Sequence, residues 1–479
     1  MPLVGKMEEE KSTLEDELTF SIPNAWEQSD KETESKITEF AEKYKVFISE
    51  SKTEREAVDN TIDLLRENGF VSIDDCEKLE QGDKAYIVNK NKAIAIVIIG
   101  KNNITDGCQI LTSHIDAPRL DLKARPIYED KDASLALFNT HYYGGIKKYQ
   151  WVSTPLAIHG KVVKEDGDMI DVTIGEDPND PVFAVSDLLP HLSKKKQSER
   201  KMKDVIKGEE LNVIIGGKPI DDDDIDEKVK INVLKILNDK YDIKEEDFTS
   251  AEIEIVPAGP ARDLGFDKSM VGGYGHDDRV CAFTSLMAGL NIETPSKTSL
   301  ILIYDKEEIG SEGNTGANSR FTQSAFQQIL AKTLGDYSME DFRNIMENSK
   351  GISGDVNPGV NPSFKSVHDL QNAGKMGQGI VITKYTGAGG KYSANDAHAE
   401  FVSYIRRVFN GNDVCWQTAE LGKVDEGGGG TVAKFLANLN LDIIDAGPPL
   451  LGMHSPFEII SKVDVYHTYK AYKAFLEAE

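Results

Sequence analysis

The chain has 479 residues, which is too long for one simple hydrophobic core, so two domains are expected. Asp and Glu number 81 against 55 Lys and Arg, which gives a net charge of −26. A surface this negative repels phosphate backbones and anionic lipids, and we therefore expect no nucleic acid and no membrane among the partners.

The four cysteines, Cys76, Cys108, Cys281 and Cys415, lie far apart and form no CxxC pair. This spacing argues against a disulfide scaffold and against a thiolate zinc site. The N-terminal segment is acidic and lacks an apolar h-region, and the longest apolar run, 93–99, is too short to span a bilayer. These features predict a cytoplasmic protein.

The first part of the chain predicts a capped helix followed by two buried strands. Thr53 and Glu56 have capping-box spacing, apolar residues follow at helical spacing, and Gly69 stands where a helix would end. The segment 92–100, which is continuously apolar from 93 to 99, and the segment 108–112 predict strands that are covered on both faces.

The remaining elements fall into two regions that differ in their predicted secondary structure. From about residue 120 to 265, short segments of alternating polarity predict a β-rich region, and these segments are 156–163, 171–174 and 251–256. After about residue 275 helices and strands alternate, in the order helix 279–290, strand 299–304, helices near 325–334 and 397–409, strand 441–444 and a C-terminal helix. The alternation predicts an α/β fold with a largely parallel sheet flanked by helices. We expect one α/β domain, 1–120 plus 266–479, with a β-rich domain, 121–265, inserted into it.

Candidate metal ligands follow the predicted strands at the points where the strands end. In an open α/β sheet functional groups gather at the carboxyl ends of strands. Here those positions hold His114, Asp116, Glu307, Glu308, Asp355 and His454. A single His or a pair of acids in so acidic a chain is usually an ordinary core or surface residue, so it is the convergence of these groups that favours a site.

Two local patterns suggest roles for these residues. In His114-Ile-Asp116 the carboxylate could hold the far ring nitrogen of the imidazole, although Asp116 could equally be a turn residue before Pro118. Neighbours in an extended segment point to opposite sides, so one carboxylate of Glu307-Glu308 could bind a metal while the other faces the water to be activated.

The available donors indicate the kind of ion. These motifs and His276-Asp277-Asp278 supply only nitrogen and oxygen, which suits zinc, cobalt or manganese. A carboxylate that bridges two ions about 3.5–4 Å apart is the recurrent arrangement of two-metal hydrolases. Rival motifs are weak, because the glycine run 427–430 lacks a Lys-Ser/Thr ending and no Gly-x-Ser-x-Gly elbow is present.

Five segments, in this order, resemble the M18 family of metalloaminopeptidases, the aspartyl aminopeptidase group, and more distantly the M42 family. They are Ser113–Lys123, Gly275–Phe283, Tyr304–Ser311, Ser353–Asp355 and Gly452–Ser455. The resemblance implies a zinc-peptidase-like fold and removal of the N-terminal residue from peptides. It also implies two divalent metal ions per subunit, with Zn²⁺ first and Co²⁺ or Mn²⁺ as alternatives.

The resemblance implies a role for each matching position. His114 would bind one metal and His454 the second, the first Asp of the Asp277-Asp278 pair would bridge them, and Glu308 and Asp355 would complete the coordination. Glu307 would be the general base and Asp116 would orient His114.

The resemblance also concerns assembly and specificity. It implies that 121–265 is a dimerisation domain, that the enzyme is a dodecamer built from dimers, and that His191 of a neighbouring subunit helps hold the tetrahedral intermediate. An ordinary loop histidine is the alternative for His191. The segment Gly422–Gly430 departs from the Arg-Asn-Asp-type segment of the aspartyl enzymes, so a preference for acidic N-terminal residues would depend on Lys391 or Lys423. Alternative functions are a carboxypeptidase or N-deacylase of the same fold and a catalytically silent assembly protein.

Overall fold

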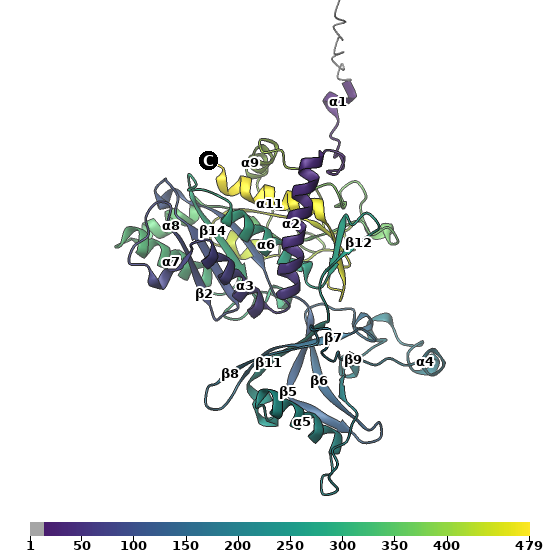
Figure 1. Cartoon of the computed structure of the whole chain (residues 1–479). Coiled ribbons are helices and arrows are strands. Elements are labelled where there is room, and N and C mark those ends of the chain that lie inside the picture. The colour runs from purple at the N-terminus through teal and green to yellow at the C-terminus, as the bar shows by residue number, and fades with distance from the viewer. Residues whose placement is uncertain (1–13) are drawn as a thin grey trace, which may run out of the picture.

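The computed structural model describes residues 14–479 and has two lobes. Figure 1 shows a larger lobe that contains the C-terminus and a smaller lobe below it, joined by a narrow waist. A short helix, α1 (Leu14–Leu18), precedes the larger lobe. No helix within 14–479 is long and apolar enough to cross a membrane.

The larger lobe is built on a mixed, nine-stranded sheet of order β1-β2-β3-β14-β4-β15-β19-β17-β18. The adjacent strands β14, β4, β15 and β19 run parallel, whereas β3 and β17, on either side of them, are antiparallel to their inner neighbours. The strands are β1 (Val71–Ser72), β2 (Lys84–Asn89), β3 (Ala93–Ile98), β14 (Thr298–Tyr304), β4 (Cys108–His114), β15 (Lys350–Ser353), β19 (Asp442–Gly447), β17 (Ile380–Thr383) and β18 (Trp416–Thr418).

Helices cover both faces of this sheet. One face packs against α2 (Lys31–Glu50), α3 (Glu54–Glu67), α6 (His276–Leu290), α9 (Ala399–Asn410) and α11 (Lys462–Glu477). The other face packs against α7 (Phe321–Leu334), α8 (Met339–Glu347) and α10 (Ala433–Ala437). Strand β3 is buried throughout because its alternate side chains belong to the two different cores.

The smaller lobe is an antiparallel sheet that the chain enters at Arg119 and leaves after Pro257. Its order is β8-β7-β11-β5-β6-β10-β9. The elements are β5 (Arg119–Asp130), β6 (Leu135–Tyr143), β7 (Leu156–Val163), β8 (Met169–Ile174), β9 (Ala184–Val185), β10 (Val213–Gly216) and β11 (Ala251–Pro257), with helices α4 (Pro190–Lys196) and α5 (Lys228–Tyr241). Its separate core surrounds Trp151, which is fully buried.

A small third sheet completes the larger lobe. It has the order β12-β13-β21-β20-β16, with β12 (Arg262–Leu264), β13 (Met270–Gly273), β21 (Glu458–Ser461), β20 (Pro449–Leu451) and β16 (Asn357–Pro358). The pairing of β13 with β21 brings the segment before α6 beside the segment that follows β20.

The predicted α/β class is confirmed, and so is the capping box of Thr53 and Glu56 at the start of α3. Two local predictions differ from the structure. Helix α7 begins at Phe321, earlier than predicted, because the ring of Phe321 packs edge-on against buried Tyr304. His454 does not follow β19 directly, because Pro448 and Pro449 interrupt that strand and Pro449 begins β20 of another sheet.

Candidate metal centre

Strand register brings the predicted ligands to one edge of the large sheet. Strands β4 and β14 are parallel with His114 opposite Tyr304, and β15 pairs with β4 so that Ser353 lies opposite Thr112. Glu307 and Glu308 lie in a 3₁₀ turn after β14, and Asp355 follows β15. Segments that are far apart in sequence therefore end side by side.

Asp277 lies between two imidazoles. Its Oδ1 is 3.4 Å from Nε2 of His114, and its Oδ2 is 3.2 Å from Nε2 of His454. Asp277 precedes the regular part of α6 and has extended rather than helical dihedral angles, with φ −80° and ψ 106°. The following peptide bond is cis. Asp278 is fully buried and accepts a hydrogen bond from the backbone N–H of His114 instead.

These side chains form two groups that could each hold a metal ion. The first group is His114, Asp277 and Asp355, and the second is Asp277, Glu308 and His454. Within each group, each residue offers one donor atom that lies within 4.8 Å of the donor atoms of the other two. Asp277 belongs to both. Nε2 of His114 and Oε1 of Glu308 are buried without a hydrogen-bond partner, as expected of atoms that coordinate a cation. The donor set of nitrogen and oxygen fits zinc.

Both histidines are fixed through their far ring nitrogens. Nδ1 of His114 lies 3.1 Å from the backbone oxygen of Asp116 and 3.3 Å from its Oδ1. Nδ1 of His454 lies 2.9 Å from the backbone oxygen of Gly145. A proton on each Nδ1 leaves each Nε2 with a free lone pair that faces Asp277, which is the arrangement of metal-binding imidazoles.

Glu307 borders both groups without belonging to either. Its Oε2 is 4.0 Å from Nε2 of His114, and its side chain is 18% exposed. Burial raises the pKa of Glu307 to about 7. A carboxylate with a pKa near neutrality that is open to solvent on one side is suited to accept and return a proton.

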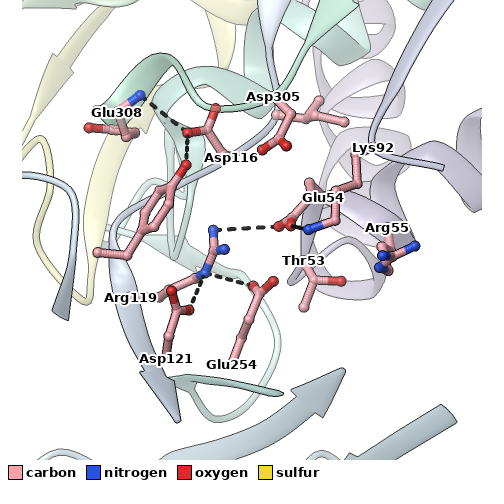
Figure 2. Close-up of polar contacts among 12 residues, drawn as sticks. Thr53, Glu54, Arg55, Lys92, Asp116, Arg119, Asp121, Glu254, Asp305 and Glu308 are labelled. Carbon is pink, nitrogen blue, oxygen red and sulfur yellow. Dashed lines mark hydrogen bonds and ion pairs between the residues drawn. The ribbon is translucent and has the colours of Figure 1, made fainter. Parts of the chain in front are cut away.

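The turn that carries Glu307 and Glu308 is held by Asp116. Its Oδ1 accepts a hydrogen bond from the backbone N–H of Glu307 at 3.1 Å, and its Oδ2 accepts one from that of Glu308 at 3.2 Å. Figure 2 shows the second of these contacts. Asp116 is fully buried, and it contacts both this turn and His114.

The crowding of carboxylates also favours a cation. Burial and the nearby charge of Asp277 raise the pKa of Glu308 well above its usual range, and burial and Asp278 do the same to the pKa of Asp355. Burial alone would raise the pKa of Asp277 too, but in the metal-free protein the imidazoles of His114 and His454, whose own pKa values are raised, are protonated and hold the pKa of Asp277 below its usual range. Several buried acids this close together repel one another unless a positive charge lies between them.

Three residues that support this site are not marked by any motif in the sequence. Glu458 is buried and accepts hydrogen bonds from the backbone N–H groups of Asp277 and His454. The hydroxyl of Tyr143 donates to Asp116, and Gly145 offers its carbonyl to His454. The Tyr143-Gly144-Gly145 sequence signals only a turn, and Glu458 lies in an ordinary strand.

His191 is apart from the centre. It is exposed on α4 in the smaller lobe, and no hydrogen bond or ion pair found for the described residues joins it to the metal groups. In Figure 1, α4 projects from the right-hand side of the smaller lobe.

A cavity of about 220 Å³ opens beside the two metal groups. It is lined by Asp277, Glu307, Asp355, Val356, Asn357, Thr383, Thr386, Leu421, Gly428, Gly429, Gly430, Thr431, Asp445, Met453 and His454. No Lys or Arg of the described chain is among them. Lys391 forms an ion pair with Asp396 at 2.9 Å instead, and Lys384 reaches the same carboxylate at 3.1 Å.

Comparison with known proteins gives matches over nearly the whole chain. The model of the family described as "Aminopeptidase I zinc metalloprotease (M18)" matches residues 47–476. A probable M18 family aminopeptidase 1 from Clostridium acetobutylicum is 48% identical over 467 residues, 97% of this chain and 100% of the relative. The Thermotoga maritima protein of the same name is 50% identical over 454 residues, 95% of this chain and 98% of the relative.

Solved structures agree with these matches. A crystal structure of an M18 family aminopeptidase from Thermotoga maritima has a TM-score of 0.92 and 49% identity, and covers 96% of this chain and 100% of its own. The S. cerevisiae mApe1 dodecamer, at 20% identity, has a TM-score of 0.73 over 93% of this chain and 97% of its own, and shares the fold.

Proposed function

The chain belongs to the M18 family of zinc metalloproteases and is an aminopeptidase, and we propose that it removes the first residue of peptides with two divalent ions bridged by Asp277. The observation that supports this most directly is the position of Asp277, whose two oxygens face Nε2 of His114 and Nε2 of His454. The family relationship favours aminopeptidase over the carboxypeptidase, N-deacylase and silent assembly protein that were alternatives on sequence alone.

We assign the ligands by the two groups. His114 and Asp355 would hold one ion, Glu308 and His454 the other, and Asp277 both. Zinc is the ion in the family's description, and cobalt or manganese would suit the same donors. When bound, two divalent ions lower the pKa of a water towards neutrality and polarise the carbonyl of the substrate.

Glu307 would act as the general base. It takes a proton from the attacking water while the water oxygen bonds to the carbonyl carbon of the first peptide bond. It then returns that proton to the nitrogen of the leaving amine as the C–N bond breaks. Asp116 would keep Glu307 in place through the backbone of the turn, and would orient His114.

For the first side chain of the substrate we propose an uncharged rather than an acidic group. A preference for Asp or Glu would need a cation in the cavity. Of the two candidates from the sequence, Lys391 is paired with Asp396, and Lys423 is exposed and does not line the cavity. The cavity walls instead carry the additional carboxylate of Asp445.

We further propose that 1–120 and 266–479 form the catalytic domain and that 121–265 serves in oligomerisation. The separate core and sheet of the smaller lobe are consistent with this. The mApe1 structure is a dodecamer, and a homo-oligomer of this kind would allow His191 of one subunit to reach the site of another and stabilise the oxyanion. Its exposure on α4 leaves it available for such a role.

The test of the proposed function separates the base from the ligands. Glu307→Gln should bind two zinc ions per subunit, as the unmodified protein does, while turnover of an N-terminal residue falls by several orders of magnitude. His114→Ala and Asp277→Asn should instead lower the zinc content measured by mass spectrometry. Normal turnover by Glu307→Gln, or full zinc content in both ligand variants, would refute the assignment.

A further inference from the structure

A three-residue segment of the smaller lobe reaches the metal centre of the larger lobe. Tyr143 ends β6, and Gly144 and Gly145 follow it. Tyr143 contacts Asp116, and Gly145 contacts His454, so the segment touches the supports of both metal groups. The contacts of Tyr143 and Gly145 are described above, but the proposed mechanism gives none of the three residues a role.

Tyr143 completes the hydrogen bonding of Asp116. Its hydroxyl donates to Oδ2 of Asp116 at 2.7 Å, beside the bond from the backbone N–H of Glu308 to the same oxygen. Burial and the charge of Asp116 raise the pKa of Tyr143 well above its usual value, so the phenol stays protonated and can only donate to this carboxylate. Its loss would leave Asp116, which orients His114 and holds the turn, without one of its donors.

The tyrosine ring is itself held in place. The guanidinium of Arg119 lies 4.0 Å from the ring centroid, in a cation–π contact, and Arg119 is almost fully buried. Figure 2 shows Arg119 in the middle of a cluster with Glu54, Asp121 and Glu254. This cluster joins both lobes, because Glu54 belongs to α3 and Glu254 to β11.

The two glycines allow the segment to approach the second metal group. A Cβ on Gly145 would lie 3.3 Å from Nδ1 of His454, the atom that faces the Gly145 carbonyl. Gly144 has a φ of +72°, and a Cβ there would lie 3.3 Å from Pro118 and 3.4 Å from Cβ of Glu308. A larger residue would therefore press on His454 from position 145, and would be strained by its backbone conformation at position 144.

We infer that the segment Tyr143–Gly145 positions both metal-binding histidines, Tyr143 through Asp116 and Gly145 through its carbonyl. The inference rests on the proposed function, because it concerns the same metal groups. Tyr143 is a positioning residue and not a catalytic residue, since it contacts no ligand atom directly. The smaller lobe thereby contributes to the metal centre of its own chain, in addition to any role in assembly.

The main test compares Tyr143→Phe with Tyr142→Phe. The two variants lose the same hydroxyl from adjacent positions of β6, but Tyr142 is 39% exposed and has no contact with Asp116. We expect Tyr143→Phe to bind Zn²⁺ about 10–100-fold more weakly, as for other residues that support metal ligands, and to lose kcat with little change in KM. Tyr142→Phe should match the unmodified enzyme. Zinc affinity is measured by competition with a chromophoric chelator.

A second readout needs neither metal nor turnover. In the metal-free enzyme, hydrogen exchange at the amides of Glu307 and Glu308 should accelerate in Tyr143→Phe, because both amides donate to Asp116. Gly145→Ala should weaken zinc binding by displacing His454 while leaving exchange at these two amides unchanged.

The outcomes distinguish this inference from the proposed function. If the unmodified protein binds no zinc, the proposed function fails. If it binds zinc and Tyr143→Phe matches it in zinc affinity and amide exchange, only the inference is overturned. Equal losses in Tyr142→Phe and Tyr143→Phe would also overturn it, because they would show a general effect on β6.

Discussion

The buried carboxylate of Glu458 accepts a hydrogen bond from the backbone N–H of His454 across 2.8 Å. Its other oxygen accepts one from the backbone N–H of Asp277 at 3.1 Å. Glu458 begins β21, which pairs with β13 just before α6, so one side chain joins the chain segments that carry two of the proposed ligands. The amide dipoles and the strand pairing keep Asp277 and His454 at a fixed separation.

Glu458→Gln should therefore weaken metal binding without removing a ligand. The amide of glutamine offers only one acceptor, so its NH₂ group would face one of the two backbone donors. We expect zinc affinity to fall by about 10–100-fold, as for other residues behind a metal shell, with activity recovering at high zinc. Glu477→Gln, on the exposed end of α11, is the matched control. Unchanged zinc affinity in Glu458→Gln would contradict this role.

Arg119→Ala should destabilise the junction between the lobes. Arg119 lies 3.1 Å from Glu254, 3.4 Å from Glu54 and 2.8 Å from Asp121, and the first two carboxylates are less than a tenth exposed. Removing the guanidinium leaves the buried carboxylate of Glu54 without the cation that does most to lower its pKa, at a cost of about 3–5 kcal/mol.

Arg55→Ala serves as the comparison for Arg119→Ala. Arg55 pairs with Glu252 at the surface, where an ion pair contributes less than about 1 kcal/mol. Urea unfolding of the metal-free protein, followed by circular dichroism, measures the free energy of unfolding of both variants. If Arg119→Ala lowers this free energy no more than Arg55→Ala does, the buried cluster is not stabilising.

His159 makes the contact between the lobes sensitive to pH. Its Nδ1 lies 2.8 Å from Glu56 of α3 and its Nε2 lies 3.0 Å from Glu176, so only the doubly protonated imidazole can donate to both. Burial alone would lower the pKa of His159, but hydrogen bonds to Glu176 and Glu56 hold it above its usual value of 6.5. A raised pKa in the folded state stabilises the protein fully below the unfolded value, and the contribution is lost as pH rises through the folded value.

The difference in melting temperature between the unmodified protein and His159→Gln should thus be largest below about pH 6.5 and shrink towards pH 9. His141→Gln, an exposed histidine on β6, should show no such trend. The lowered pKa of Glu176 acts only at more acidic pH and leaves this window unaffected. A difference that grows with pH would refute the assigned protonation.

The site residues that could be predicted from sequence are those that directly follow a strand of the large sheet. His114, Glu307 and Asp355 follow β4, β14 and β15, and parallel strands bring their carboxyl ends to one edge whatever the rest of the chain does. Asp277 follows no strand of that sheet, and only the family resemblance pointed to it. The support from Gly145 to His454 spans 309 residues between two different sheets, and no periodicity or spacing reports such a contact.

The cavity should make the enzyme favour uncharged over acidic first residues. Asp445 is 3% exposed and lines the cavity, and burial raises its pKa to about 6, so the carboxylate is ionised at pH 7.5. A first side chain of Glu would bring another carboxylate into the same enclosed space, where charge repulsion is strong. A panel of aminoacyl p-nitroanilides should therefore give a kcat/KM for Leu or Met at least about tenfold above that for Glu, a difference of about 1.4 kcal/mol. Asp445→Asn should lower the ratio of kcat/KM for Leu to kcat/KM for Glu, because it should raise the value for Glu and leave the value for Leu nearly unchanged. A higher kcat/KM for Glu than for Leu in the unmodified enzyme would show that a cation outside the cavity, such as Lys423, selects the substrate instead.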